Sequence, residues 1–105
     1  MAKTKFSLNA APTFTLTVAV PVQGGADAEI QITFRHKQRK EFASFVEKLE
    51  GRKQSEVLEE IIAAWDLEDE LNKANLLRLT DNYMGASETI IGAYVDEMTR
   101  ARRGN

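Results

Sequence analysis

The stretch that decides the fold is residues 13–35, which read TFTLTVAVPVQGGADAEIQITFR. Apolar and polar residues alternate on both sides of a central loop, which is the period of a half-buried β-strand. The loop contains Gly24 and Gly25, and glycine reaches the positive φ angles that a hairpin turn requires. The sequence therefore predicts a β-hairpin. Proline has no amide hydrogen, so Pro21 should lie at a sheet edge or at the turn, outside the strand pairing.

One face of this hairpin is apolar, and two strands alone are only marginally stable in water. The face needs a cover of helices or of strands from another copy. An unpaired strand edge beside an apolar face can also pair with a second chain. We therefore predict a homo-oligomer that associates through the hairpin, with contact residues Val18, Val20, Ile30 and Ile32.

After Arg35 the apolar period changes to about 3.6 residues, the period of an amphipathic helix. A first helix is predicted near residues 37–50, with Gly51 as its C-terminal cap. A second has Ser55 as its N-cap and carries an apolar stripe of Val57, Leu58, Ile61, Ile62 and Trp65. Residues 66–71 form an acidic connection. A short third helix is capped by Asn72 and ends by residues 81–82, and a fourth follows Gly85 and closes with Arg100, Arg102 and Arg103.

These elements predict an α+β fold in which an N-terminal β-hairpin packs against a layer of about four helices. A chain of 105 residues has room for a single domain. Within it we expect a mobile arm over residues 1–12, the hairpin over residues 13–35 and a helical part over residues 36–105.

Composition limits the partners. Sixteen acidic and fourteen basic residues give a formal net charge of -2, so we expect binding to neither nucleic acid nor a membrane. The chain has no cysteine, and we find no signal peptide and no apolar run long enough to span a bilayer. We therefore expect a cytoplasmic protein.

The inventory of reactive groups is small. His36 is the only histidine and lies among basic residues, where a solvated junction residue is favoured over a catalytic one. The acidic residues 66–70 lack the spacing of a calcium loop, and Gly24-Gly25 lacks the lysine and the strand-to-helix context of a phosphate loop. We predict that the protein is not an enzyme and needs no cofactor and no metal.

Two features leave alternatives open. Residues 35–53 contain seven Lys or Arg and three Glu, which favours a solvated face or a patch for an acidic protein surface, such as residues 66–70 of a neighbouring copy. Trp65, Tyr83 and Tyr94 carry large contact areas with one polar atom each, so they suit either a core or an interface.

The stretch VLEEIIAAWDL at residues 57–67 resembles tail assembly chaperones of long-tailed bacteriophages. So do Tyr83-Met84-Gly85-Ala86, Ile90-Ile91-Gly92-Ala93-Tyr94 and the terminal Arg102-Arg103-Gly104-Asn105. The chain has Met84 where a proline often precedes the glycine. The resemblance covers most of the chain from the hairpin onward, and its motifs are short.

The resemblance implies a non-enzymatic assembly factor of the host cytoplasm, absent from the mature virion. Such a factor binds the tape measure protein until tail tube subunits polymerise around it. It also implies two further candidate partners, the tail tube protein and a longer frameshifted form of the same chain. The alternative is a structural virion component or a small oligomeric scaffold, and a small hydrolase is a distant third. We expect the client to bind on the second and fourth helices, with Trp65, Leu67 and Tyr94 as anchors.

Overall fold

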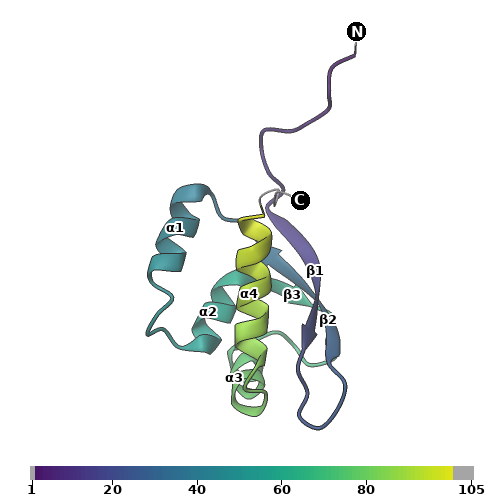
Figure 1. Cartoon of the computed structure of the whole chain (residues 1–105), viewed down its shortest axis with the longest axis vertical. Coiled ribbons are helices and arrows are strands. Elements are labelled where there is room, and N and C mark those ends of the chain that lie inside the picture. The colour runs from purple at the N-terminus through teal and green to yellow at the C-terminus, as the bar shows by residue number, and fades with distance from the viewer. Residues whose placement is uncertain (1, 101–105) are drawn as a thin grey trace, which may run out of the picture.

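The computed structural model describes residues 2–100. In chain order the elements are β1 (Thr13–Val20), β2 (Ala28–Arg35), α1 (Arg39–Glu47), α2 (Gln54–Ile61), β3 (Ile62–Trp65), α3 (Lys73–Asn82) and α4 (Ala86–Met98). The three strands form an antiparallel sheet in the order β1-β2-β3. Helices α2 and α4 pack on one face of this sheet, and α1 stands at the side of α2 away from the strands (Figure 1). The predicted α+β fold is confirmed.

The predicted hairpin is present with its expected faces. β1 and β2 pair without interruption from Thr13 opposite Arg35 to Val20 opposite Ala28. Pro21 follows the last paired residue of β1, so its missing amide hydrogen leaves no gap in the pairing. In the loop, Gly24 has a φ of 75°, a backbone conformation that glycine adopts without steric cost.

The end of the second helix differs from the prediction. The apolar stripe predicted one helix as far as Trp65, but α2 ends at Ile61 and the chain continues as the strand β3. Ile62 already has extended backbone angles, with φ -96° and ψ 123°. The reason is tertiary, because β3 pairs with the edge of β2 that β1 leaves free, and this pairing satisfies backbone groups of the central strand. The hairpin thereby becomes a three-stranded sheet.

Other helix ends also differ from the sequence pattern. α1 ends at Glu47, and Gly51, with a φ of 87°, lies beyond it in the turn toward α2. The N-cap of α2 is Lys53, so the prediction of Ser55 was wrong. The prediction of Asn72 as the cap of α3 is confirmed, since its side chain accepts a hydrogen bond of 2.8 Å from the Asn75 amide. Arg102 and Arg103, predicted to close the last helix, lie outside the described residues.

The chain before β1 makes little contact with the rest. Residues 2–12 form no helix or strand, and all of them are exposed. Their backbone is tied to the domain where the His36 amide donates to the Pro12 carbonyl at 2.9 Å. From that point the N-terminal segment runs away from the sheet (Figure 1). We call residues 2–12 the arm.

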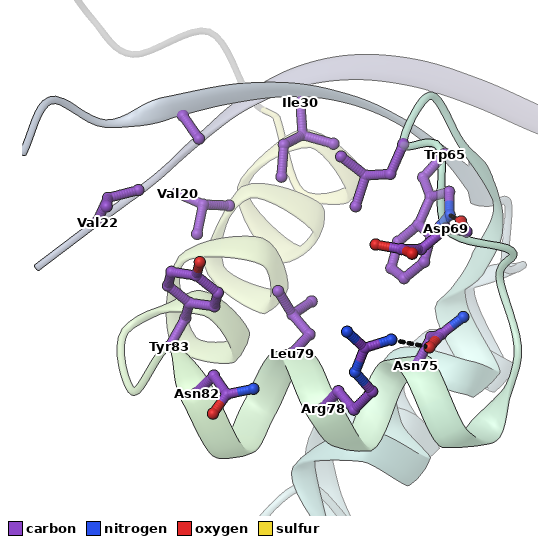
Figure 2. Close-up of a pocket in the computed structure, with 12 residues that line it drawn as sticks. Val20, Val22, Ile30, Trp65, Asp69, Asn75, Arg78, Leu79, Asn82 and Tyr83 are labelled. Carbon is purple, nitrogen blue, oxygen red and sulfur yellow. Dashed lines mark hydrogen bonds between the residues drawn. The ribbon is translucent and has the colours of Figure 1, made fainter.

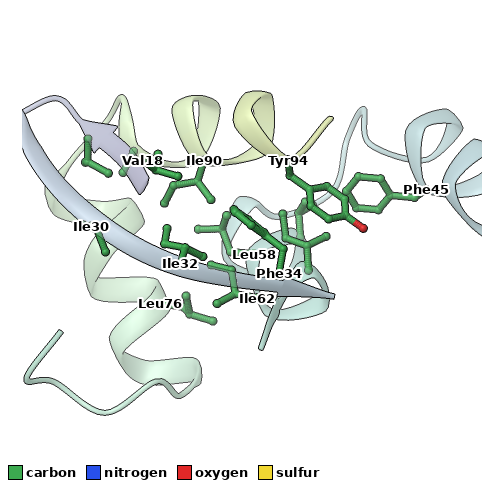
Figure 3. Close-up of a cluster of buried hydrophobic side chains, with 14 residues drawn as sticks. Val18, Ile30, Ile32, Phe34, Phe45, Leu58, Ile62, Leu76, Ile90 and Tyr94 are labelled. Carbon is green, nitrogen blue, oxygen red and sulfur yellow. The ribbon is translucent and has the colours of Figure 1, made fainter. Parts of the chain in front are cut away.

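The hydrophobic core lies between the sheet and helices α2 and α4 (Figure 3). Its centre is Tyr94 of α4, which is fully buried. The Tyr94 ring lies 5.3–6.2 Å, centroid to centroid, from four phenylalanine rings, those of Phe14, Phe34, Phe42 and Phe45. The opposite face of the hairpin is polar, and there the hydroxyls of Thr15 and Thr33 hydrogen bond across the strands at 2.9 Å.

A charged cluster ties α1 and its flanking turns to α2. The Glu60 carboxylate lies 2.7 Å from both the Lys37 ammonium and the Arg52 guanidinium. Burial would raise the pKa of Glu60, but hydrogen bonds from Lys37 and Arg52 outweigh it, so the pKa of this carboxyl is lowered. Lys37 also lies over the Phe45 ring, 5.4 Å from its centroid.

Candidate binding groove

A groove opens between the loop end of the hairpin and helix α3 (Figure 2). Its volume is about 380 Å³, within the range of sites that accept a ligand or an apolar side chain. The hairpin, the β3–α3 connection and α3 with its C-terminal turn all contribute to the lining: Val20, Val22, Ala28, Ile30, Trp65, Leu67, Asp69, Asn75, Arg78, Leu79, Asn82 and Tyr83. We call this site the groove.

Trp65 and Tyr83 lie at opposite ends of the groove, with Leu79 of α3 between them (Figure 2). The Trp65 indole N–H donates to the Asp69 carbonyl at 2.8 Å. This bond ties the ring to the loop that follows β3. The half-buried Trp65 ring therefore has a satisfied polar atom and still presents apolar surface to the groove.

The α3 side of the groove carries polar groups. The Arg78 guanidinium donates to the Asn75 side-chain oxygen at 2.8 Å. The side-chain nitrogen of Asn75 donates to the Glu70 backbone carbonyl at 2.6 Å. Asp69 lines the groove, and the exposed Glu68 and Glu70 flank it in the sequence. None of these three carboxylates is in an ion pair within residues 2–100. The groove thus combines an apolar floor with a polar rim that carries one carboxylate, Asp69, and one guanidinium, Arg78, an arrangement typical of peptide-binding surfaces.

The residues predicted as client anchors are separated by the fold. Trp65 and Leu67 both line the groove. Tyr94 is fully buried at the centre of the core, and its hydroxyl donates to the Arg35 carbonyl at 2.8 Å. Burial, with the charges of Glu60 and Glu41, raises the pKa of Tyr94 to about 12. In this structure Tyr94 therefore offers no surface to a partner.

The four apolar residues predicted to mediate self-association also lie inside the domain. Val18, Val20, Ile30 and Ile32 are all buried, at 7% exposure or less. The helical layer covers their face because α2 and α4 carry enough apolar surface to do so without a second copy. Of the four, Val20 and Ile30 still reach the groove wall.

The sequence analysis did not predict that α3 contributes to the groove. Arg78 and Leu79 of α3 and Tyr83 at its C-cap form one side of the groove. A signal was present in the sequence, because Leu76, Leu77 and Leu79 are too close together for one narrow helical stripe. Leu76 is buried, Leu79 faces the groove and Leu77 remains 49% exposed.

The described residues also bear on a metal site and on a membrane span. His36 is exposed, and residues 2–100 contain no group of three or more His, Asp or Glu side chains placed to hold a metal ion. Within the same residues, no helix has both the length and the apolar character needed to cross a membrane. The groove is therefore the feature on which we base a functional argument.

The fold and the groove define a small α+β protein with an open apolar groove between a hairpin and a helix. The whole chain, residues 1–105, matches the family model described as phage tail assembly chaperone, and the protein belongs to this family. This confirms the family that the sequence motifs indicated. Neither the comparison with curated proteins nor the comparison with solved structures found a match. The chaperone family suggests a non-enzymatic role in building the phage tail through interaction with tail proteins.

Proposed function

We propose that this chaperone binds the tape measure protein through the groove and keeps it soluble until tail tube subunits polymerise around it. The observation that carries the proposal is the groove itself, an apolar channel with Trp65 and Tyr83 at its ends in a chain of the tail assembly chaperone family. An amphipathic helix places apolar side chains at spacings of three and four residues along one face. Two or three of these apolar side chains fit into the groove.

The affinity of one groove is expected to be low. A volume of about 380 Å³ accommodates only a few side chains, so each copy covers a short part of its client. A long helical client offers many similar segments, and several copies bound along it gain hold through multivalency. Weak individual contacts also allow the copies to leave when the tube subunits arrive.

The protein then acts in the host cytoplasm and is absent from the mature virion. The tail tube protein and a longer frameshifted form of the chain are further candidate partners. The alternative role, a structural virion component or scaffold, makes the opposite prediction for the finished particle. Mass spectrometry of purified virions distinguishes the two, because a temporary chaperone is lost and a structural component is retained.

The client site is tested with segments of the phage's own tape measure protein. Trp65 is the only tryptophan of the chain and lines the groove, so its fluorescence reports occupancy. Tyr83→Ser should weaken binding by about tenfold or more, because it removes an aromatic anchor at one end of the groove. Leu77→Ser is the matched control, since Leu77 lies on α3, is 49% exposed and does not line the groove. Equal binding by the two variants would contradict the proposed site.

For self-association we propose the outer edge of β1. Within residues 2–100, β1 pairs with β2 alone, so its other edge is available to a second copy. Thr17→Lys places a charge on the exposed face of this edge strand and should weaken assembly with little loss of stability. Val18→Lys buries the charge in the core and should weaken both. Sedimentation of a strictly monomeric wild type at high concentration would refute the edge contact.

A further inference from the structure

We propose that the arm of a second copy pairs as an additional strand with the outer edge of β1. This inference rests on the edge contact proposed above and names the segment that makes it. The arm has the sequence pattern of a half-buried strand, because Phe6 and Leu8 alternate with Lys5 and Ser7. Phe6 and Leu8 are 77% and 91% exposed, so both gain free energy by leaving water.

The edge of β1 has apolar surface left to cover. On its apolar face Val18 and Val20 are buried, whereas Phe14 and Leu16, in the half of the strand nearest the arm, are only half-buried. β1 is the outermost strand of the sheet within residues 2–100. A further strand beside it, with apolar side chains on the same face, would bury Phe14 and Leu16 more completely.

One antiparallel register matches the arm to this surface. When Leu8 lies opposite Phe14 of the second copy, Phe6 lies opposite Leu16 of the second copy. Residues directly opposite each other in a sheet share a face, so both pairs lie on the apolar side. The register therefore places apolar side chains beside apolar ones and leaves the polar residues of the arm on the polar face.

The backbone groups of β1 fit the same register. The His36 amide donates to the Pro12 carbonyl, so Pro12 and every second residue after it direct their backbone groups toward β2. Thr15 therefore directs its amide and carbonyl to the outer edge, where Ser7 of the second copy lies opposite. The missing amide hydrogen of Pro12 does not interrupt this pairing, because that position faces β2.

The connection between the arm and β1 favours a second copy over the same chain. To pair with its own β1, the arm must reverse between Asn9 and Thr13, a stretch without the glycine that supplies positive φ angles in short hairpin loops. Pro12 also favours extended backbone angles at Ala11. In the structure the arm runs away from the sheet (Figure 1). Two copies related by a two-fold axis at Ala11 need no reversal, and each places its arm on the other's β1.

The result is a symmetric dimer in which each copy gives one arm and receives one. The groove stays open in this dimer, because its β1 residue, Val20, lies beyond the Phe14 and Leu16 that the arm covers. Two grooves in one particle hold a client with repeated apolar segments better than one groove does. Exchange of the arms therefore supports the proposed multivalent coat.

The test uses introduced cysteines, because the chain has none of its own. Ser7→Cys and Thr15→Cys are made in separate full-length chains, which are mixed and mildly oxidised. Opposite residues in an antiparallel pair have Cα atoms about 5.5 Å apart, within reach of a disulfide. The mixture should therefore form a disulfide-linked dimer on a non-reducing gel. Each chain alone should form little, because residue 7 of one copy lies opposite residue 15 of the other.

The matched control replaces Thr15→Cys by Ala19→Cys, on the same exposed face of β1 but about 13 Å further along the strand. Little linkage is expected with Ala19→Cys. No linkage in either mixture, or equal linkage in both, overturns the proposal. A chain that carries both Ser7→Cys and Thr15→Cys, and closes an internal disulfide while the mixture stays unlinked, assigns the arm to its own β1 and also overturns it.

Sedimentation of the wild-type chain separates this proposal from the two on which it builds. A dimer in sedimentation with an unlinked mixture refutes the arm contact and leaves the contact at the β1 edge. No tape measure protein is present in these experiments, so arm pairing and client binding fail or succeed separately.

A charge exchange tests the register by a second route. Lys5 lies opposite Thr17 of the second copy, so Thr17→Lys opposes two like charges, whereas Thr17→Glu opposes two unlike charges. At low salt Thr17→Lys should raise the dimer dissociation constant about threefold or more, and adding Lys5→Glu to the same chain should reverse this rise. Equal weakening by Thr17→Lys and Thr17→Glu, or a Thr17→Lys defect that Lys5→Glu does not relieve, refutes the register.

Discussion

Replacing Tyr94 by alanine should bring the domain close to unfolding. Removing a large buried aromatic ring costs about 3–5 kcal/mol. The ring of Tyr94 is fully buried among four phenylalanine rings, so little collapse of the site can offset this cost. The lost hydrogen bond to the Arg35 carbonyl, 2.8 Å long, adds about 1 kcal/mol. The expected total is about 4–6 kcal/mol. The whole free energy of unfolding of a domain is only roughly 5–15 kcal/mol, so this loss is a large part of it.

Two further variants serve as comparisons for Tyr94→Ala. Tyr94→Phe keeps the ring and removes only the hydroxyl, so it should lower the free energy of unfolding by about 1 kcal/mol. Trp65→Ala removes a half-buried ring from the groove and should cost less stability than Tyr94→Ala. Its larger effect should be on client binding, where an anchor of this kind contributes about 2 kcal/mol or more.

The assay is urea unfolding followed by circular dichroism, with client binding measured on the same preparations by a label on the client. The core assignment of Tyr94 predicts a large stability loss for Tyr94→Ala and near-normal binding by Tyr94→Phe. A Tyr94→Ala variant that loses less than about 2 kcal/mol but no longer binds the client would refute this reasoning. It would restore Tyr94 as a surface anchor.

Four further outcomes follow from the contacts described. The raised pKa of Tyr94, about 12 in the folded chain against 10.0 unperturbed, contributes stability that is present below pH 10 and lost as the pH rises toward 12. Urea unfolding of Tyr94→Phe across this range should lack that part of the decline. Glu60→Gln should lower the free energy of unfolding by about 1 kcal/mol or less at neutral pH. The difference from wild type should shrink as the pH falls below 4.5, because the Glu60 carboxylate is then protonated in the folded chain and its ion pairs with Lys37 and Arg52 are lost. Asn72→Ala should destabilise α3 by about 1 kcal/mol, seen as faster amide exchange in its first turn, whereas Asn72→Ser should retain most of the cap. Chelator should leave the melting temperature unchanged, and a drop of several degrees on adding EDTA would reveal a cation site.

The sequence alone determined the hairpin and most of the helices. The alternation from Phe14 to Val20 and from Ile30 to Phe34 has one interpretation, because a period of two places every second side chain on the same face. The Asn72 cap was equally local, since its side chain bonds to an amide three residues away. The family, too, was indicated by short motifs, and the family match over residues 1–105 confirmed it.

The tertiary structure decided the state of residues 62–65. Ile61, Ile62 and Trp65 fit a helical stripe, and the local pattern contains nothing that excludes a helix. The free edge of β2 lies far away in the sequence, yet its unpaired backbone groups make a third strand more favourable than another helical turn. Local sequence patterns cannot predict a strand that forms by pairing with residues far away in the chain.

The same distinction separates the three predicted anchors. Trp65, Leu67 and Tyr94 were chosen from stripes that are wider than one contact requires, and the sequence could not say which side of each stripe would be covered. Tyr94 is covered because four phenylalanine rings from β1, β2 and α1 converge on it. Trp65 and Leu67 stay accessible because the chain turns into a strand and a loop before α3 can close over them. Periodicity shows which residues are apolar together, but their burial depends on which distant elements reach them, and only the packed chain decides that.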